Sequence, residues 1–102
     1  MNEVIEAKRA QIRAICRRFG VSRLDVFGSV LNESFDPTSS DVDVLVEFDT
    51  TPGFDYVASY FGLKEELEEL LGRPVDLVSV TSIRNPFFRA EVMRTREKLY
   101  AA

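Results

Sequence analysis

The sequence predicts an α/β (α+β) fold in which a small mixed β-sheet packs against helices. Two observations lead to this class. Short segments rich in β-branched residues alternate along the chain with longer segments of helical periodicity, and glycine or proline marks most of their ends. At 102 residues the chain has room for one modest hydrophobic core, so we expect a single domain over residues 1–102.

The N-terminal segment predicts an amphipathic helix followed by a strand. Apolar side chains recur over residues 3–19 with the 3.6-residue period of a helix, and Gly20 stops the pattern. Cys16 lies on this apolar stripe, so we expect a buried structural thiol rather than a reactive one. Residues 23–27 then predict a short strand that ends at Gly28.

The centre of the chain predicts a loop and a second strand. Residues 32–40 are rich in Asn, Asp, Pro, Thr and Ser, which is the composition of a loop. Residues 42–48 alternate with the period of a strand, so successive side chains point to opposite faces. One predicted face consists of Val42, Val44, Val46 and Phe48, and the other of Asp43, Leu45 and Glu47.

The second half predicts a helix and a third strand. A turn at residues 50–53 leads into the helix, which Gly72 ends as a C-terminal cap with Pro74 just beyond it. The predicted apolar face of this helix consists of Val57, Tyr60, Phe61, Leu67, Leu70 and Leu71. Residues 75–80 are rich in β-branched side chains and predict the strand.

The C-terminal segment predicts a last helix and a short strand. Asn85 precedes Pro86 in the order that an N-cap and a first helical residue take, and the helix is expected to run to about Arg96. Leu99 and Tyr100 predict a short terminal strand.

Composition excludes several classes of function. The chain has one cysteine and no histidine, which excludes an internal disulfide, zinc sites of the Cys/His kind and every His-based catalytic triad. No stretch approaches the roughly 18 apolar residues of a membrane span, and charged residues interrupt the first ten positions. We therefore expect a cytoplasmic location.

Charge is distributed unevenly along the chain. The formal charge is +4 over residues 1–23, −11 over residues 24–79 and +3 over residues 80–102, which gives the net charge of −4. An acidic middle argues against a general nucleic-acid-binding protein, which presents a basic surface. It suits a domain whose centre holds metal ions, although solvated acidic helix faces explain the same asymmetry.

Asp41 and Asp43 are the sharpest chemical feature. Side chains two apart on a strand share a face and lie roughly 6–7 Å apart along it. Two such carboxylates raise each other's pKa, and a cation offsets the repulsion. Mg²⁺ is bound by one or two carboxylates together with water and substrate phosphates, so the pair predicts a metal site. The alternative is that Asp41 merely ends the loop and Asp43 lies on a solvated face.

Two further features strengthen the metal-site interpretation. Asp76 lies within the third apolar strand, and it falls beside the other two aspartates if the second and third strands are neighbours in register. Gly28 and Ser29 directly follow the first strand. Glycine permits close backbone approach to an anion, and the serine hydroxyl adds a donor to a phosphate.

Three segments taken together resemble the minimal nucleotidyltransferase family of the polymerase-β-like superfamily. They are Phe27-Gly28-Ser29, Ser40-Asp41-Val42-Asp43-Val44-Leu45-Val46 and Pro74-Val75-Asp76-Leu77-Val78. The stretch from Asn85-Pro86-Phe87-Phe88 to Arg94-Thr95-Arg96-Glu97 is also similar to the usual ending of that family. The likeness spans nearly the whole chain, and the three-part combination is specific although each part alone is not.

The resemblance implies a nucleotidyltransferase fold with a defined set of site residues. Asp41 and Asp43 would bind two Mg²⁺ ions, and Asp76 would complete the metal and catalytic set and orient or deprotonate the attacking hydroxyl. Gly28 and Ser29 would hold the triphosphate of ATP. The implied reaction transfers an AMP-like group to a hydroxyl and releases pyrophosphate, an in-line displacement at two metal ions.

The resemblance also implies partners. Family members often act as antitoxins beside a small helical HEPN-domain ribonuclease, which they neutralise by adenylylating a tyrosine near its active site. The expected partners are therefore a HEPN-type toxin and a nucleoside triphosphate, with no membrane and no direct nucleic-acid contact.

The sequence departs from the family pattern after Gly28-Ser29. The spacing from Ser29 to Asp41 is one residue longer than usual, which costs little because loop entropy grows slowly with length. The usual arginine is absent from the segment Val30-Leu31-Asn32-Glu33. We interpret the chain as a protein adenylyltransferase antitoxin. The alternatives are a fold of weak activity that inhibits by binding alone, and a small-molecule nucleotidyltransferase, for which 102 residues leave no second domain.

Overall fold

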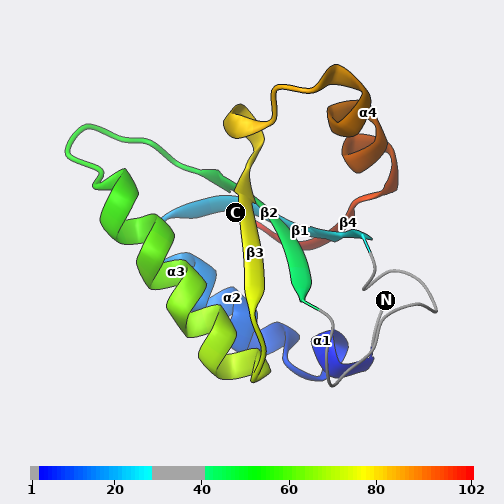
Figure 1. Ribbon diagram of the computed structural model, residues 1–102. Coiled ribbons are helices and arrows are strands. Elements are labelled where there is room, and N and C mark those ends of the chain that lie inside the picture. The colour runs from blue at the N-terminus through cyan, green and yellow to red at the C-terminus, as the bar shows by residue number, and fades with distance from the viewer. Residues whose placement is uncertain (1–2, 29–40) are drawn as a thin grey trace.

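A four-stranded mixed sheet forms the centre of the molecule in the computed structural model, which describes residues 3–28 and 41–102 (Figure 1). The strands are β1 (Val21–Phe27), β2 (Val42–Phe48), β3 (Val75–Ser79) and β4 (Glu97–Ala101). Their order is β3-β2-β1-β4, with β1 antiparallel to both neighbours and β2 parallel to β3. The predicted mixed sheet is confirmed. Ser29 and the predicted loop at residues 32–40 lie outside the described residues.

Helices lie on both faces of this sheet (Figure 1). The short α1 (Glu3–Ala7), α2 (Arg9–Arg18) and α3 (Tyr56–Leu71) pack on one face, and α4 (Pro86–Thr95) lies on the other, after the 3₁₀ turn η2 (Val80–Ser82). Among the described helices, none is long and apolar enough to cross a membrane.

The alternation along β2 divides the core in two, as predicted. Val42, Val44 and Val46 are buried in the main cluster against α2 and α3. Leu45 points to the opposite face and belongs to a smaller cluster. The other members are Phe27 of β1, Val80 of η2 and Val92 of α4. Asp43 shares the face of Leu45, because side chains two apart on a strand point to the same side. The smaller cluster therefore borders the candidate site.

The predicted single helix over residues 3–19 is wrong in one respect, since the chain breaks it at Lys8. α1 ends at Ala7 and α2 begins at Arg9, with Lys8 in a non-helical turn between them. The Lys8 ammonium donates a hydrogen bond of 2.8 Å to the Leu70 carbonyl near the end of α3. Helical periodicity depends on neighbouring residues, so it does not predict this contact between residues far apart in the sequence. Cys16 is buried as predicted, and burial raises the pKa of its thiol to about 12.

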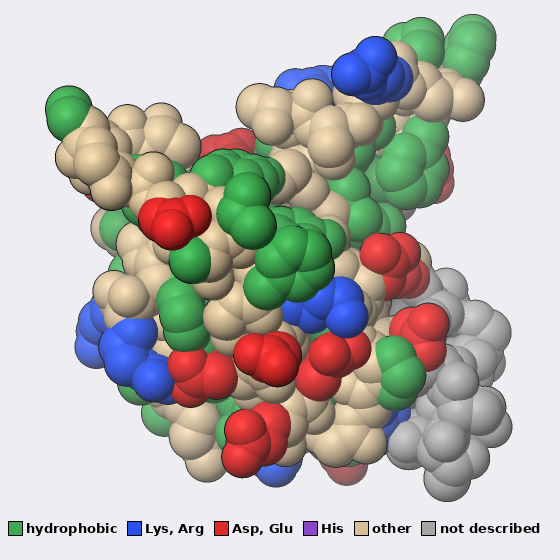
Figure 2. All heavy atoms as spheres, turned by 60° about the vertical axis from the view of Figure 1, so that its left-hand side comes forward, with side chains coloured by type: hydrophobic (Ala, Val, Ile, Leu, Met, Phe, Trp, Pro, Cys, Tyr) green, Lys and Arg blue, Asp and Glu red, His purple; other side chains and the backbone are tan. Residues whose placement is uncertain are grey.

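The predicted apolar face of α3 is partly wrong. Its buried stripe consists of Leu63, Leu67 and Leu71, whereas Val57 and Phe61 are 64% and 58% exposed. Phe61 lies two positions before Leu63, so the two side chains point to nearly opposite sides of the helix. The view turned toward α3 shows hydrophobic side chains at the surface among acidic ones (Figure 2).

Both ends of α3 and the start of α4 are capped. The Asp55 carboxylate accepts from the Ala58 amide, and Gly72 takes the left-handed conformation that ends the helix. The Asn85 side chain accepts from the Phe87 and Phe88 amides, and Pro86 stands at the first turn, as predicted. The terminal strand is longer than predicted, because β4 pairs with β1 from Glu97 to Ala101, with an irregularity in the register between Leu24 and Asp25.

Candidate active site

The parallel pairing of β2 with β3 brings Asp43 and Asp76 side by side. These two residues are partners in the register of the two strands, which is the condition that the sequence left open. On its other side Asp43 pairs with Phe27 of β1, the residue before Gly28. Residues far apart in the sequence thus meet at one end of the sheet, on the face of the smaller cluster.

Among the described residues, the charges that act on the carboxyl group of Asp43 are all negative. Burial raises the pKa of Asp43, and the negative charges of Asp76 and Asp41 raise it further, as does a hydrogen bond with Asp76. Asp76 and Asp41 are exposed, while Asp43 is half-buried. The charged groups that perturb Asp43 are all carboxylates, so a bound cation would lower the free energy of the ionised pair.

The donor set fits Mg²⁺ in part. Asp41 lies directly before β2 and acts on Asp43 through its charge. Among the described residues, no three acidic or cysteine side chains lie close enough together to form a metal site on their own. Mg²⁺ needs only one or two protein carboxylates when phosphate and water supply the remaining ligands, so the pair Asp43 and Asp76 fits a metal–nucleotide complex.

Gly28 is required by the shape of the site. It takes a φ of +71°, and a Cβ atom at this position would lie 2.5 Å from Oδ2 of Asp43. Any side chain would therefore displace the carboxylate as well as strain the backbone. The sequence predicted a glycine for close approach of a phosphate, and the structure adds contact with Asp43. Ser29, the other predicted phosphate-binding residue, lies outside the described residues.

A pocket of about 540 Å³ opens beside this acidic pair, between the ends of β1 and β2 and helix α4. Its volume is in the range of ligand sites. The lining residues are Phe27, Gly28, Asp43, Phe88, Glu91, Val92, Thr95 and Glu97. The sequence analysis did not predict that α4 lines this pocket. The signal for it was the aromatic pair Phe87-Phe88, which follows Asn85 and Pro86 at the start of the helix.

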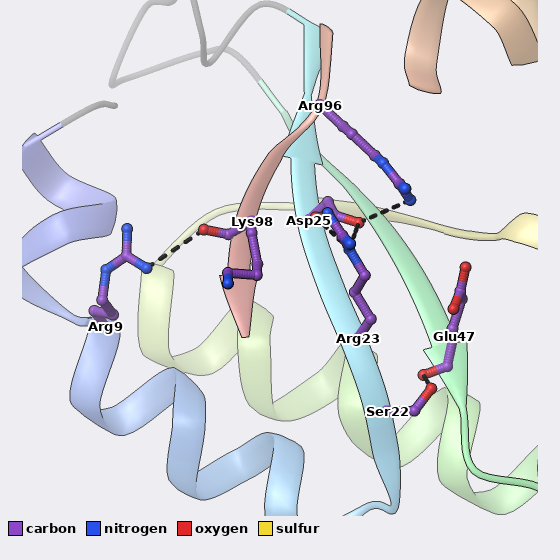
Figure 3. Close-up of polar contacts among 7 residues, drawn as sticks. All are labelled: Arg9, Ser22, Arg23, Asp25, Glu47, Arg96 and Lys98. Carbon is purple, nitrogen blue, oxygen red and sulfur yellow. Dashed lines mark hydrogen bonds and ion pairs between the residues drawn. The ribbon is translucent and has the colours of Figure 1, made fainter. Parts of the chain in front are cut away.

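Asp25 is a second feature that the sequence analysis missed (Figure 3). It is 1% exposed, and both of its carboxylate oxygens accept from Nε of Arg23 at 3.0 Å. Arg96, which follows α4, donates to Oδ2 of Asp25 at 3.3 Å. Figure 3 shows both guanidinium groups reaching the same carboxylate on β1. The ion pair connects the residue after α4 to β1, the strand that ends at Gly28. The sequence signal for a buried carboxylate here was an aspartate between the apolar residues Leu24 and Val26.

Paired aspartates on neighbouring strands of a mixed sheet, with a tight glycine turn against them, are the arrangement that the resemblance to nucleotidyltransferases predicts. Residues 8–99 match the nucleotidyltransferase domain family, so the chain belongs to this family and is a nucleotidyltransferase. The predicted fold and family resemblance are thereby confirmed.

One curated relative and two solved structures show which proteins this chain is similar to. The protein adenylyltransferase MntA of Thermococcus cleftensis is 35% identical over 83% of this chain and 79% of its own. A solved structure assigned as a minimal nucleotidyltransferase is 36% identical, covers 95% of both chains and has a TM-score of 0.76. A complex of a tri-AMPylated Shewanella oneidensis HEPN toxin with an MNT antitoxin contains a chain that is 20% identical. It has a TM-score of 0.66 over 96% of this chain and 73% of that one, a likeness that shows the fold alone.

Proposed function

We propose that this chain is a Mg²⁺-dependent protein adenylyltransferase that transfers AMP from ATP to a tyrosine of a HEPN-type ribonuclease toxin and so acts as its antitoxin. The observation that carries the proposal is the register of β2 with β3, which sets Asp43 beside Asp76. The identity to a protein adenylyltransferase supports the choice of AMP and of a protein acceptor. The fold shared with a chain of a complex between an MNT antitoxin and an AMPylated HEPN toxin supports the choice of partner.

In the proposed site the roles are divided among five residues. Asp41 and Asp43 hold the metal ions, Gly28 and Ser29 lie against the triphosphate, and Asp76 completes the carboxylate set. Mg²⁺ bound here would offset the charge of the polyphosphate and of the leaving pyrophosphate. The raised pKa of Asp43 supports its role, because a cation is what favours the ionised form of a carboxylate surrounded by others.

The proposed transfer is a displacement at the α-phosphorus of ATP. The acceptor hydroxyl oxygen forms a bond to this phosphorus while the bond to the bridging oxygen of the β-phosphate breaks, and pyrophosphate leaves. The hydroxyl proton passes to the carboxylate of Asp76. That residue is exposed, so a hydroxyl carried by another protein has access to it.

A second candidate function is inhibition by binding alone. The sequence favours it at one point, because Val30-Leu31-Asn32-Glu33 replaces the arginine that follows Gly-Ser in the resembling family. Weak binding of the triphosphate would leave the fold as an antitoxin without appreciable transfer.

Labelled ATP separates the two candidates. The purified chain is incubated with Mg²⁺, ATP and a candidate HEPN-type toxin, with the label at the α- or the γ-phosphate. We expect label from the α-position alone to reach the partner, at a tyrosine located by mass spectrometry. Inhibition of the partner's ribonuclease activity with no label transferred from either position would contradict the catalytic proposal and favour binding alone.

A further inference from the structure

Four exposed side chains form a row along the outer side of α3, which we call the α3 ridge. They stand four residues apart, so they follow one another along the helix surface at intervals of about 6 Å. In chain order they are Val57, Phe61, Glu65 and Glu69. The ridge is therefore apolar in its first half and acidic in its second half. The view turned toward α3 shows hydrophobic side chains at the surface with acidic ones below them (Figure 2).

The apolar half of the α3 ridge is exposed and held in place. The Phe61 ring meets the Tyr60 ring edge-on, with ring centroids 5.1 Å apart. Tyr60 is fixed in turn, because its hydroxyl donates a hydrogen bond of 2.5 Å to the Leu77 carbonyl and its ring stacks on that of Tyr56. An exposed ring that is already fixed loses little conformational freedom when another protein covers it, which is the property of a binding anchor.

The acidic half of the α3 ridge limits what can cover it. Neither Glu65 nor Glu69 forms an ion pair with another described residue, and the neighbouring Lys64 pairs with Glu68 at 3.1 Å, so those two charges offset each other. The ridge is therefore negative. An anionic membrane surface and a nucleic-acid backbone are both repelled by it.

A second copy of this chain that meets the ridge through its own ridge does not match it either. If the two helices ran in the same direction, carboxylates would face carboxylates. If they ran in opposite directions, the apolar half of each would face the acidic half of the other. A helix that is apolar in one half and basic in the other matches both halves of the ridge.

We infer that the α3 ridge is a docking surface for an amphipathic helix of the proposed partner protein. Apolar side chains of that helix cover the first half of the ridge, and lysine or arginine side chains face the second half. The inference rests on the proposed antitoxin function for the identity of the protein that supplies the helix, and it adds to that function the surface that binds it.

The direction of α3 connects this surface with the candidate active site. The acidic half of the ridge leads to the end of α3 at Leu71, and the chain then turns through Gly72 into β3, whose second residue is Asp76. A protein docked along α3 therefore reaches toward the end of the sheet that carries the exposed Asp76.

Two synthetic helical peptides test the surface without the partner protein. Both carry leucine along one side, and the second half of each carries lysine in one peptide and glutamate in the other. They are titrated into the full chain while valine methyl resonances are followed by NMR. We expect the lysine peptide to shift the signals of Val57 and to leave those of Val92, buried under α4, unchanged. The glutamate peptide should shift neither. No shift at Val57, or equal binding of both peptides, overturns the inference.

Matched variants test the surface with a candidate HEPN-type toxin in place of the peptides. Phe61→Ala should raise the dissociation constant at least about tenfold, as expected for loss of an anchor. Phe87→Ala makes the same change at a ring that is 85% exposed on α4 and should leave the constant unchanged. Equal effects of the two variants overturn the inference. A dimer of the chain that Phe61→Ala disrupts in sedimentation equilibrium overturns it in favour of a second copy.

Charge reversal tests the acidic half of the ridge. Glu65→Lys should lower the association rate constant with the toxin at least about threefold at low salt, because charges at the edge of an interface act mainly on association. Glu3→Lys makes the same change of charge at an exposed position on α1 and should have little effect. An equal decrease for both variants contradicts a specific role of the ridge.

Transfer kinetics separate this inference from the proposed function. Phe61→Ala should raise the KM for the toxin at least about tenfold and leave the KM for ATP unchanged. An unchanged KM for the toxin overturns the docking surface while the transfer function stands. Binding of the toxin that depends on Phe61, together with no transfer of AMP by the wild-type chain, overturns the proposed transfer instead.

Discussion

Replacing Asp25 with asparagine removes a negative charge that two arginines share inside the protein. The Asp25 side chain is 2% exposed, while the side chains of Arg23 and Arg96 are 35% and 21% exposed. Asparagine keeps the shape and one acceptor oxygen. It leaves the two guanidinium groups close together without their counter-charge, so we expect a loss of stability.

The expected decrease in the free energy of unfolding depends on how exposed Asp25, Arg23 and Arg96 are. Breaking a fully buried ion pair costs about 3–5 kcal/mol, and exposed pairs contribute at most about 1 kcal/mol. Here the carboxylate is buried and both arginines are partly hydrated, so we expect a loss of about 2–3 kcal/mol. For a domain of this length that lowers Tm by about 8–20 °C.

Urea denaturation followed by circular dichroism measures the free energy of unfolding of both proteins. Glu91→Gln is the matched control, because Glu91 pairs with Arg94 at 2.7 Å while both side chains are more than half exposed. This control should lose less than about 0.5 kcal/mol. A loss of the same small size for Asp25→Asn would refute the reasoning, since it would mean that the buried carboxylate does not hold the end of α4 to β1.

Three further predictions concern the site and the core. Gly28→Ala, whose added carbon meets the Asp43 carboxylate, should reduce AMP transfer by at least about 10²-fold in a steady-state assay, because misplacement of a reacting group by about 1 Å has that cost. In EDTA, Asp43→Asn should be more stable than the wild type at neutral pH in thermal melts. The raised pKa of Asp43 means that the folded state binds the proton more tightly than the unfolded state, so stability is lost as pH rises through the raised value. Cys16 should react with a thiol reagent only after unfolding, because burial raises its pKa to about 12.

Each of these predictions has a result that contradicts it. Full activity of Gly28→Ala would show that the Asp43 carboxylate is free to move aside. Equal melting temperatures of Asp43→Asn and the wild type from acid to neutral pH would remove the argument for repulsion. A rapid reaction of Cys16 in the native protein would place the thiol at the surface.

Much of the fold was predictable because the sequence signals are local. The alternation of β2, the cap at Asn85 and the stop at Gly72 each depend on neighbouring residues, and the structure confirms all three. The break in the helix at Lys8 was not predictable, since Lys8 there contacts Leu70, which is distant in the sequence. The exposure of Phe61 was not predictable either, since it depends on which side of α3 faces the sheet.

For the candidate site, the residue types could be predicted from the local sequence, whereas their proximity could not. The aspartates and Gly28 stand out in the sequence because their residue types are unusual within or beside strands. Their proximity depends on the register of β2 with β3, which periodicity does not encode. The pairing of Asp25 with Arg96 and the pocket under α4 join segments about 70 residues apart, so they emerge only from the folded chain.

The rate of AMP transfer by three single variants tests the central claim most directly. Asp43→Asn and Asp76→Asn each change one member of the carboxylate pair, and Glu47→Gln changes a half-buried carboxylate further along the same face of β2. With Mg²⁺, labelled ATP and the partner, the rate of AMP transfer by both aspartate variants should fall at least about 10²-fold, because the metal supplies several kcal/mol of transition-state stabilisation. The rate of Glu47→Gln should stay near that of the wild type. Transfer by Asp76→Asn at the wild-type rate, or an equal loss in Glu47→Gln, would contradict the assignment of the paired aspartates as the catalytic centre.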